Sequence, residues 1–323
     1  MKKISEILAR RGSAVEPAVL PSFGAYNNSQ SAQFLRQLMQ QNYTVANLKN
    51  ETPEDFQAHI LSLIGHRDAA IEGYTDTTHQ RDMSIQFEWG HNHDFGAFSL
   101  QGAMRDRHIE VLATFMEECG VPERSLAGKR VLDIGCWTGG MSLLLAAMGA
   151  QVFAIEEVRK YADCVNYMKN AFGLDNLTVE NRSLYSLTDE KFYDRFDIAI
   201  YSGVLYHVTD PVLSLRIVFN SLKDGGRCLL ETMAREGKGS FCGYYGASDT
   251  LKRSADGGPR AGWNWFVPSL EAVSRLMTDV GFDVRHATLH EGARAGARRA
   301  LALGLREKHV DMLRAGLSRP DIR

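Results

Sequence analysis

The second half of the chain alternates short apolar segments with helical ones, and this alternation limits the fold more than any other feature. Five segments predict strands, at residues 130–136, 151–157, 177–183, 196–203 and 226–233. Segments between them, such as 158–173 and 211–223, space their apolar residues three and four positions apart, as helices do. Strands that alternate with helices form a parallel sheet covered on both faces. We therefore expect an α/β fold with a Rossmann-like parallel sheet.

Two further strand candidates, at 283–289 and 297–305, follow a predicted helix at 269–281. No helical pattern separates these two strands, so we expect them to form an antiparallel edge of the sheet. Near the N-terminus, segments 31–41 and 52–64 also have helical spacing, and the second begins with a Thr-Pro-Glu-Asp cap. They predict a small N-terminal helical unit.

The pattern divides the chain into three regions. Residues 1–108 form a helical and loop-rich region that we expect to contact substrate and to support a homodimer. Residues 109–310 form the α/β domain, with an insertion at 234–267 that lies over the site, and residues 311–323 form a basic tail. The basic excess toward the C-terminus fits either an RNA-contacting edge or an ordinary solvated helix.

The charge balance excludes a strong general attraction to nucleic acid or to anionic membranes. The chain has 37 Lys and Arg against 39 Asp and Glu, a formal charge of −2. It contains no apolar run of the length of a secretion signal or a membrane span, so we expect a cytoplasmic protein. The cysteines form no Cys-x-x-Cys pair, and His91 and His93 have no third ligand nearby. We therefore expect reduced thiols and no metal site.

The segment Val131-Leu-Asp-Ile-Gly-Cys-Trp-Thr-Gly-Gly140 is an apolar strand that breaks into glycines where a helix begins. A tight turn that needs glycine is one explanation. Dinucleotide binding is another, but if Gly135 is the first glycine of G-x-G-x-x-G, Trp137 stands where the backbone must approach a pyrophosphate. The indole favours a ligand without phosphates, held by its amino-acid end against the turn.

Two acidic residues, Glu156 and Glu157, end the second predicted strand about twenty residues after the glycines. A carboxylate in this position can accept hydrogen bonds from both ribose hydroxyls of an adenosine. The alternative is a solvated acidic pair at the start of a helix. Because Glu156 continues the strand and Glu157 adjoins the helix, we assign the ribose to Glu156.

An Asp in the first strand, a glycine turn and an acid after the second strand together resemble the class I S-adenosylmethionine-dependent methyltransferases over residues 125–235. The resemblance implies S-adenosyl-L-methionine as the cofactor. It implies the methionyl group near Asp133 and Gly135, the ribose at Glu156, and the adenine near Ser183 or Leu184. The cofactor-binding residues that it implies are Asp133, Gly135, Cys136, Trp137, Gly139, Glu156, Ser183, Leu184, Ser202 and Gly203.

Four segments are similar to those of the tRNA wobble-uridine carboxymethyltransferases. They are Ser202-Gly-Val-Leu-Tyr-His207-Val-Thr-Asp-Pro211, Glu88-Trp89, Leu230-Glu-Thr232 and residues 263–269. That family holds the extra carboxylate of its cofactor with a Trp-Lys pair, where this chain offers Arg105 or Arg107. It also has basic residues where this chain has Val208-Thr209-Asp210. These departures favour plain methyl transfer to a small-molecule acceptor. Wobble-uridine (carboxy)methylation of tRNA and a non-catalytic cofactor-binding scaffold are the alternatives.

Tyr206 and His207 are the catalytic candidates. His207 follows the fourth strand, at the edge where open α/β sheets bind ligands, and either acts as a general base or packs against the next helix. Aromatic faces of the tryptophans and tyrosines in the surrounding segments suit a cationic sulfonium. The alternative is that Trp89, Trp263 and Trp265 seat the N-terminal unit and the insertion on the sheet.

An amino acid or a thioether such as methionine is the acceptor that we expect. A thioether needs no base, because its sulfur has no proton to lose. An amino acid needs a cation for its carboxylate, Arg298 or Arg299, and an acid for its ammonium group, Asp210 or Glu231. The substrate-binding candidates are Trp89, Asp210, Glu231, Tyr244, Trp263, Trp265 and Arg298.

Overall fold

A computed structural model describes residues 21–22, 24–66, 86–245, 264–292 and 298–307. The candidate Trp263 and the predicted tail helix lie outside these residues. Among the described residues, no helix combines the length and the apolarity needed to cross a bilayer.

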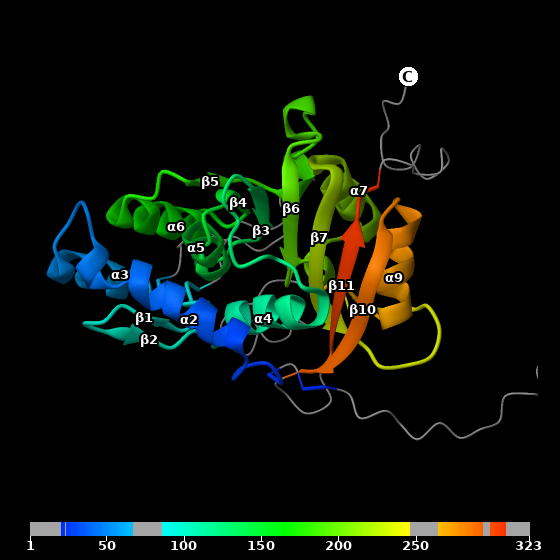
Figure 1. Cartoon of the computed structure of the whole chain (residues 1–323), viewed down its shortest axis with the longest axis horizontal. Helices are drawn as coiled ribbons and strands as arrows, with labels where there is room; N and C mark the ends of the chain where they lie inside the picture. The colour runs from blue at the N-terminus through cyan, green and yellow to red at the C-terminus, as the bar shows by residue number, and fades with distance from the viewer. Residues whose placement is uncertain (1–20, 23, 67–85, 246–263, 293–297, 308–323) are drawn as a thin grey trace, which may run out of the picture.

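The centre of the molecule is a seven-stranded sheet with the order β10-β11-β7-β6-β3-β4-β5 (Figure 1). Strands β3 to β7 are parallel, whereas β11 is antiparallel to β7 and β10 is antiparallel to β11. Both the parallel sheet and its antiparallel edge are therefore confirmed. The strands are β3 (Arg130–Ile134), β4 (Gln151–Glu156), β5 (Leu177–Asn181), β6 (Phe196–Ser202), β7 (Leu222–Ala234), β10 (Asp283–Glu291) and β11 (Arg298–Leu305).

Helices cover both faces of the sheet, and each face has its own hydrophobic cluster. Helices α4 (Arg107–Cys119), α5 (Gly140–Ala147) and α6 (Arg159–Phe172) contribute to one cluster, and α7 (Pro211–Ser221) and α9 (Leu270–Asp279) contribute to the other. Helix α5 is buried along almost its whole length, which explains why its sequence is apolar on every side.

The N-terminal helical unit packs on the first of these faces. It contains α2 (Gln30–Asn42) and α3 (Pro53–Leu63), and Thr52 caps α3 by accepting a hydrogen bond from the N–H of Asp55, as the Thr-Pro-Glu-Asp sequence predicts. The Tyr43 hydroxyl donates to the Leu143 carbonyl of α5 at 2.7 Å, which ties the unit to the domain. Figure 1 shows α2, α3 and the hairpin of β1 (His93–Asp94) and β2 (Ser99–Leu100) at the end of the molecule opposite β10 and α9.

Short elements complete the described chain. Three-residue 3₁₀ helices occur at Val45–Asn47, Leu184–Ser186, Glu190–Phe192 and Leu205–His207. Within the insertion, β8 (Cys242–Tyr244) pairs with β9 (Phe266–Pro268) as a small antiparallel ladder. The N–H of Trp265 donates to the carbonyl of Tyr206 at 2.8 Å, so this ladder is anchored beside the end of β6.

Candidate functional site

A cavity of about 840 Å³ lies at the carboxyl ends of the parallel strands. Open α/β sheets bind their ligands at this edge. The sequence candidates that line the cavity are Asp133, Gly135, Cys136, Trp137, Glu156, Ser183, Leu184, Ser202, Gly203, Tyr206, His207 and Arg298. The fold thus brings together twelve of the candidates, from the ends of four parallel strands with the loops that follow them and from the first residue of β11.

The glycine turn after β3 has three residues with positive φ. They are Gly135 (71°), Trp137 (51°) and Gly139 (80°). A Cβ on Gly135 would lie 2.8 Å from a methyl carbon of Val204, so this position needs glycine for space as well as for conformation. Trp137 adopts the left-handed conformation despite its side chain, which is uncommon for an indole residue.

Gly139 lies at the back of the turn rather than in the cavity wall. It is the N-cap of α5, and a Cβ there would lie 3.0 Å from Val165 of α6. Close packing of helix on helix, rather than contact with a ligand, accounts for this glycine.

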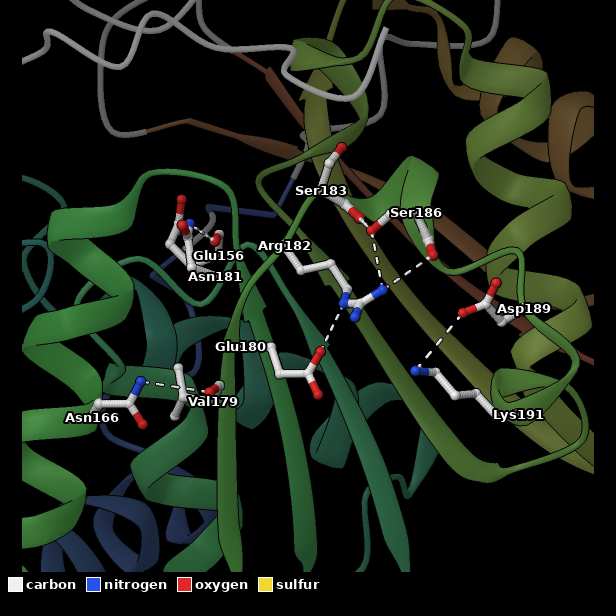
Figure 2. A network of polar contacts seen from close by, with 10 residues as sticks. All are labelled: Glu156, Asn166, Val179, Glu180, Asn181, Arg182, Ser183, Ser186, Asp189 and Lys191. Atoms are coloured by element: carbon white, nitrogen blue, oxygen red, sulfur yellow. Dashed lines mark hydrogen bonds and ion pairs between the residues drawn. The ribbon is translucent and has the colours of Figure 1, made fainter. Parts of the chain in front are cut away.

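Glu156 is buried at the end of β4, and both of its carboxylate oxygens accept backbone hydrogen bonds. Oε2 accepts from the N–H of Trp137 and Oε1 from the N–H of Val158, each at 2.9 Å. A carboxylate oxygen has a second lone pair, so each oxygen keeps one site for a further donor. Glu157 also lines the cavity. The Asn181 side chain donates to the carbonyl of Glu156 at 2.9 Å (Figure 2) and to that of Glu157 at 2.8 Å.

The wall beyond Glu156 is formed by the segment after β5. Ser183 caps the 3₁₀ helix Leu184–Ser186 by accepting from the N–H of Tyr185. Arg182, which sequence reasoning did not select, lines the cavity next to it. Its guanidinium donates to Glu180 at 2.7 Å and to the carbonyl of Ser186 at 3.3 Å (Figure 2), so its position is fixed by residues of its own segment.

Asp133 and Cys136 are buried beneath the turn. Burial, reinforced by the nearby Glu156 carboxylate, raises the pKa of Asp133 to about 7, although the Ser142 hydroxyl donates to it at 2.5 Å. Burial also raises the pKa of Cys136 well above its ordinary value, so this sulfur remains a thiol.

Three charged residues form a cluster at the other side of the cavity. Glu231 of β7 is fully buried, and its Oε1 accepts from Arg107 at 3.2 Å and from the Nε of Arg299. Its Oε2 accepts from the Ser202 hydroxyl at 3.1 Å. Burial opposes ionisation of Glu231, but the two arginines outweigh it and lower its pKa. Arg107 and Arg299 line the cavity, whereas Glu231 lies behind them.

Arg299 is the residue of this cluster that has an unused donor. Its side chain is 5% exposed, and its Nη2 is buried without a hydrogen-bond partner among the described residues. The guanidinium carbon lies 5.3 Å from the centroid of the Tyr206 ring. Arg298, the preferred cation in the sequence assignment, lines the cavity too, but it pairs with Glu236 at 3.0 Å and with Glu291 at 3.8 Å.

Several predicted acceptor contacts lie elsewhere in the described part of the chain. Asp210 caps α7 by accepting from the N–H of Leu213 at 2.8 Å, and Glu231 accepts hydrogen bonds from the two arginines. Neither acid lines the described cavity, where an ammonium group would bind. Trp89 is 5% exposed and packs against Phe95, and Tyr244 is 68% exposed on β8. Trp89, Tyr244 and Trp265 are absent from the described cavity wall, which for the two tryptophans agrees with the alternative that they seat neighbouring segments.

Sequence reasoning missed several residues of the wall because they carry no motif. They include Met104, His108, Tyr161 and Asn264, and His91 was considered only as a metal ligand. Among the described residues, no three His, Cys, Asp or Glu side chains gather as a metal site.

Comparison with known proteins gives the family. A family model described as "Methyltransferase domain" matches residues 100–287. A tRNA U34 carboxymethyltransferase of Desulfotalea psychrophila is 30% identical over 158 residues, which are 49% of this chain and 46% of the relative. A ubiquinone biosynthesis O-methyltransferase of Pseudomonas entomophila is 32% identical over 129 residues, 40% of this chain and 54% of the relative. The chain thus spans about half the length of these curated relatives.

Solved structures of similar fold include a 1,6-didemethyltoxoflavin-N1-methyltransferase of Burkholderia thailandensis. Its TM-score is 0.46 at 15% identity, with 61% of this chain and 77% of that chain covered. The family match extends over more than half of the 323 residues. The chain therefore belongs to the methyltransferase-domain family, among the class I S-adenosylmethionine-dependent methyltransferases.

Proposed function

We propose that this chain transfers the methyl group of S-adenosylmethionine to a small acceptor that carries a carboxylate, with a thioether such as methionine as the acceptor class. The observation that carries the proposal is the buried Arg299, which lines a cavity that also contains the candidate cofactor residues and whose Nη2 has no hydrogen-bond partner among the described residues. The cofactor, when bound, supplies an electrophilic methyl group on a sulfonium.

The cofactor half of the cavity fits a nucleoside. Glu156 keeps one lone pair on each oxygen for the two ribose hydroxyls, while its other lone pairs hold the turn in place. The side chains of Ile134, Ile155 and Leu184 supply an apolar wall for the adenine. Trp137 stands in the turn at the position where a dinucleotide fold has glycine to let the backbone approach a pyrophosphate, which supports a ligand that has no phosphates.

The acceptor half of the cavity contains two arginines that share one carboxylate. Arg107 and Arg299 both pair with Glu231, and the buried Nη2 of Arg299 has no hydrogen-bond partner among the described residues. A buried donor without an acceptor is costly, so this wall favours an acceptor molecule whose carboxylate accepts a hydrogen bond from Arg299. Because Glu231 is occupied, an ammonium group of an amino-acid acceptor would have to face another part of the wall.

The remaining wall suits an acceptor atom that needs no proton removed. Burial, assisted by Arg107, lowers the pKa of His91 to about 3, and burial also holds the pKa of His108 well below its ordinary value. Both imidazoles are therefore weak bases. His207 is the remaining histidine of the described wall, and its ring centroid lies 4.1 Å from that of Tyr206. For a thioether, the task of the site is to hold the acceptor sulfur in line with the methyl carbon in a dry pocket.

A second candidate function is wobble-uridine carboxymethylation of tRNA. The same arginine cluster supports it, because Arg107 and Arg299 can equally hold an extra carboxylate on the cofactor, and curated relatives carry that name. This function predicts a preference for the carboxylated cofactor and tRNA binding that weakens steeply with salt.

The test is incubation of the protein with methyl-labelled S-adenosylmethionine and a metabolite pool that contains methionine and tRNA, followed by identification of the labelled species. We expect the label in a small carboxylate-bearing sulfonium, and Arg299→Gln should raise the acceptor KM with little change in cofactor affinity. Label in tRNA would favour the second function. Cofactor binding without labelling of any acceptor would favour a non-catalytic scaffold. Cytoplasmic location and dimerisation through the N-terminal region stay predictions.

A further inference from the structure

Two histidines, the partly buried His91 and the buried His108, lie together in the cavity wall, and the proposed chemistry does not use them. Their ring centroids are 4.6 Å apart, and the His91 ring also lies edge-on to the indole of Trp137 at 5.7 Å. His108 is 1% exposed. Both residues line the cavity.

Each histidine has a ring nitrogen without a partner. The Nδ1 atoms of His91 and His108 are buried and form no hydrogen bond with the residues that the structure describes. Buried polar atoms in folded proteins are nearly always hydrogen-bonded, so two such atoms on neighbouring rings of one cavity wall indicate a group that arrives with a ligand.

The chain makes room for His91 at the start of α5. A Cβ on Gly140, the first residue of α5, would lie 2.8 Å from the His91 Nδ1, and a Cβ on Gly102 would lie within 2.4 Å of the His91 backbone. The N-cap of α5 is Gly139, which has no side chain to bind the free N–H groups of the first turn. The His91 imidazole therefore lies next to the first turn of α5, where the helix N-terminus favours a negative charge.

The direction of the cofactor follows from the order of the strands. If the ribose lies at Glu156 on β4 and the adenine beyond it toward β5, the rest of the cofactor extends back across β3. Helix α5 begins directly after β3, beyond the glycine turn. The amino-acid end thus reaches the first turn of α5, where His91 lies.

We propose that His91, supported by His108, binds the carboxylate at the amino-acid end of S-adenosylmethionine, together with the first turn of α5. This inference rests on the proposed function. The amino-acid end is a zwitterion, so a neutral donor recognises its carboxylate without adding a charge next to its ammonium group. Burial first, and then the charge of Arg107, keep His91 in that neutral form.

The test compares two ligands that differ only in the amino-acid end. S-adenosylhomocysteine has this end, and 5′-methylthioadenosine lacks it while keeping the adenosine and the sulfur. The variant His91→Phe keeps an aromatic ring and removes both nitrogens. We expect calorimetry to show about tenfold weaker binding of S-adenosylhomocysteine by the variant, and the same affinity as wild type for 5′-methylthioadenosine. Equal losses for both ligands, or no loss for either, would overturn the proposal.

His93→Phe is the matched control. His93 is also buried, but its Nε2 contacts the Tyr43 carbonyl at 3.0 Å and its ring stacks on Phe95, so it has a structural partner. Its replacement should not distinguish the two ligands. If His91→Phe does not fold, His108→Asn makes the same comparison, with a smaller selective loss expected. Failure of the wild-type protein to bind both ligands would instead refute the cofactor site of the proposed function.

Discussion

The N–H of Trp137 donates a hydrogen bond of 2.9 Å to the carboxylate of Glu156, 19 positions further along the chain. The glycine turn after β3 and the acidic end of β4 are therefore one unit. The left-handed conformation of Trp137 directs its N–H to this carboxylate, so the residue that departs from the usual glycine also positions the ribose candidate.

Replacement of Glu156 by Gln should weaken binding of S-adenosylhomocysteine by about 1–3 kcal/mol, because a charge-assisted hydrogen bond to the ribose becomes a neutral one. Isothermal titration calorimetry measures this change. Glu157→Gln is the matched control and should bind nearly as wild type does. An unchanged affinity of the Glu156 variant would show that the ribose lies elsewhere.

Substitutions of Arg299 and Glu231 should have strongly non-additive effects on the free energy of unfolding. Arg299→Met leaves a buried carboxylate with one arginine fewer, and Glu231→Met removes the carboxylate with which the buried Arg299 pairs, so each variant should lose about 3–5 kcal/mol of unfolding free energy. The double variant should lose much less than the sum of the two. Urea denaturation tests this, and additive losses would contradict a direct pair.

Asp133 should make the stability of the ligand-free protein fall with rising pH. Its pKa is raised from 3.8 to about 7 by burial, so the folded state binds more protons than the unfolded state between these values. Stability contributed by the protonated group is therefore lost as pH rises from about 4 to about 7. Compared with Asp133→Asn, the wild-type protein should lose about 2 kcal/mol between about pH 5.5 and about pH 8.5. If the unfolding free energies of the wild-type protein and of Asp133→Asn, measured by chemical denaturation, change with pH in the same way, this prediction is wrong.

The pH profile of methyl transfer should identify the type of acceptor atom. With a thioether acceptor the rate should be flat from about pH 6 to about pH 9, and His207→Asn should retain most of its kcat. A rise governed by one group near pH 7 that disappears in His207→Asn would instead assign His207 as a general base, and so an acceptor hydroxyl, amine or thiol.

The features that the sequence predicts correctly are those that depend on residues close together along the chain. Glu156, the glycine turn and the cap at Thr52 each follow from a few consecutive positions, and the structure places them accordingly. The arginine cluster depends on partners 68 and 124 positions apart, on β11, α4 and β7, and no local pattern indicates that they meet. For the same reason Glu231 was assigned to an acceptor ammonium group, although strand pairing directs it to two arginines.

Exposure was equally hard to predict for aromatic residues. Tyr244 and Trp89 belong to similar aromatic segments, but one is exposed on a short ladder and the other is packed beneath the N-terminal unit. Whether an indole or phenol faces a cavity depends on how the loops cover the sheet, which their own sequence does not specify.

Strand β11 runs antiparallel to β7, and Arg299 pairs in register with Met233. Its first residues, rather than its last, therefore lie at the carboxyl edge of the parallel strands. During synthesis on the ribosome, the turn, Glu156 and Glu231 all emerge before Arg299 does. A nascent chain that ends before residue 298 contains the residues of the nucleoside end of the cavity but lacks Arg299, so the residues of the two halves of the site are synthesised at different times.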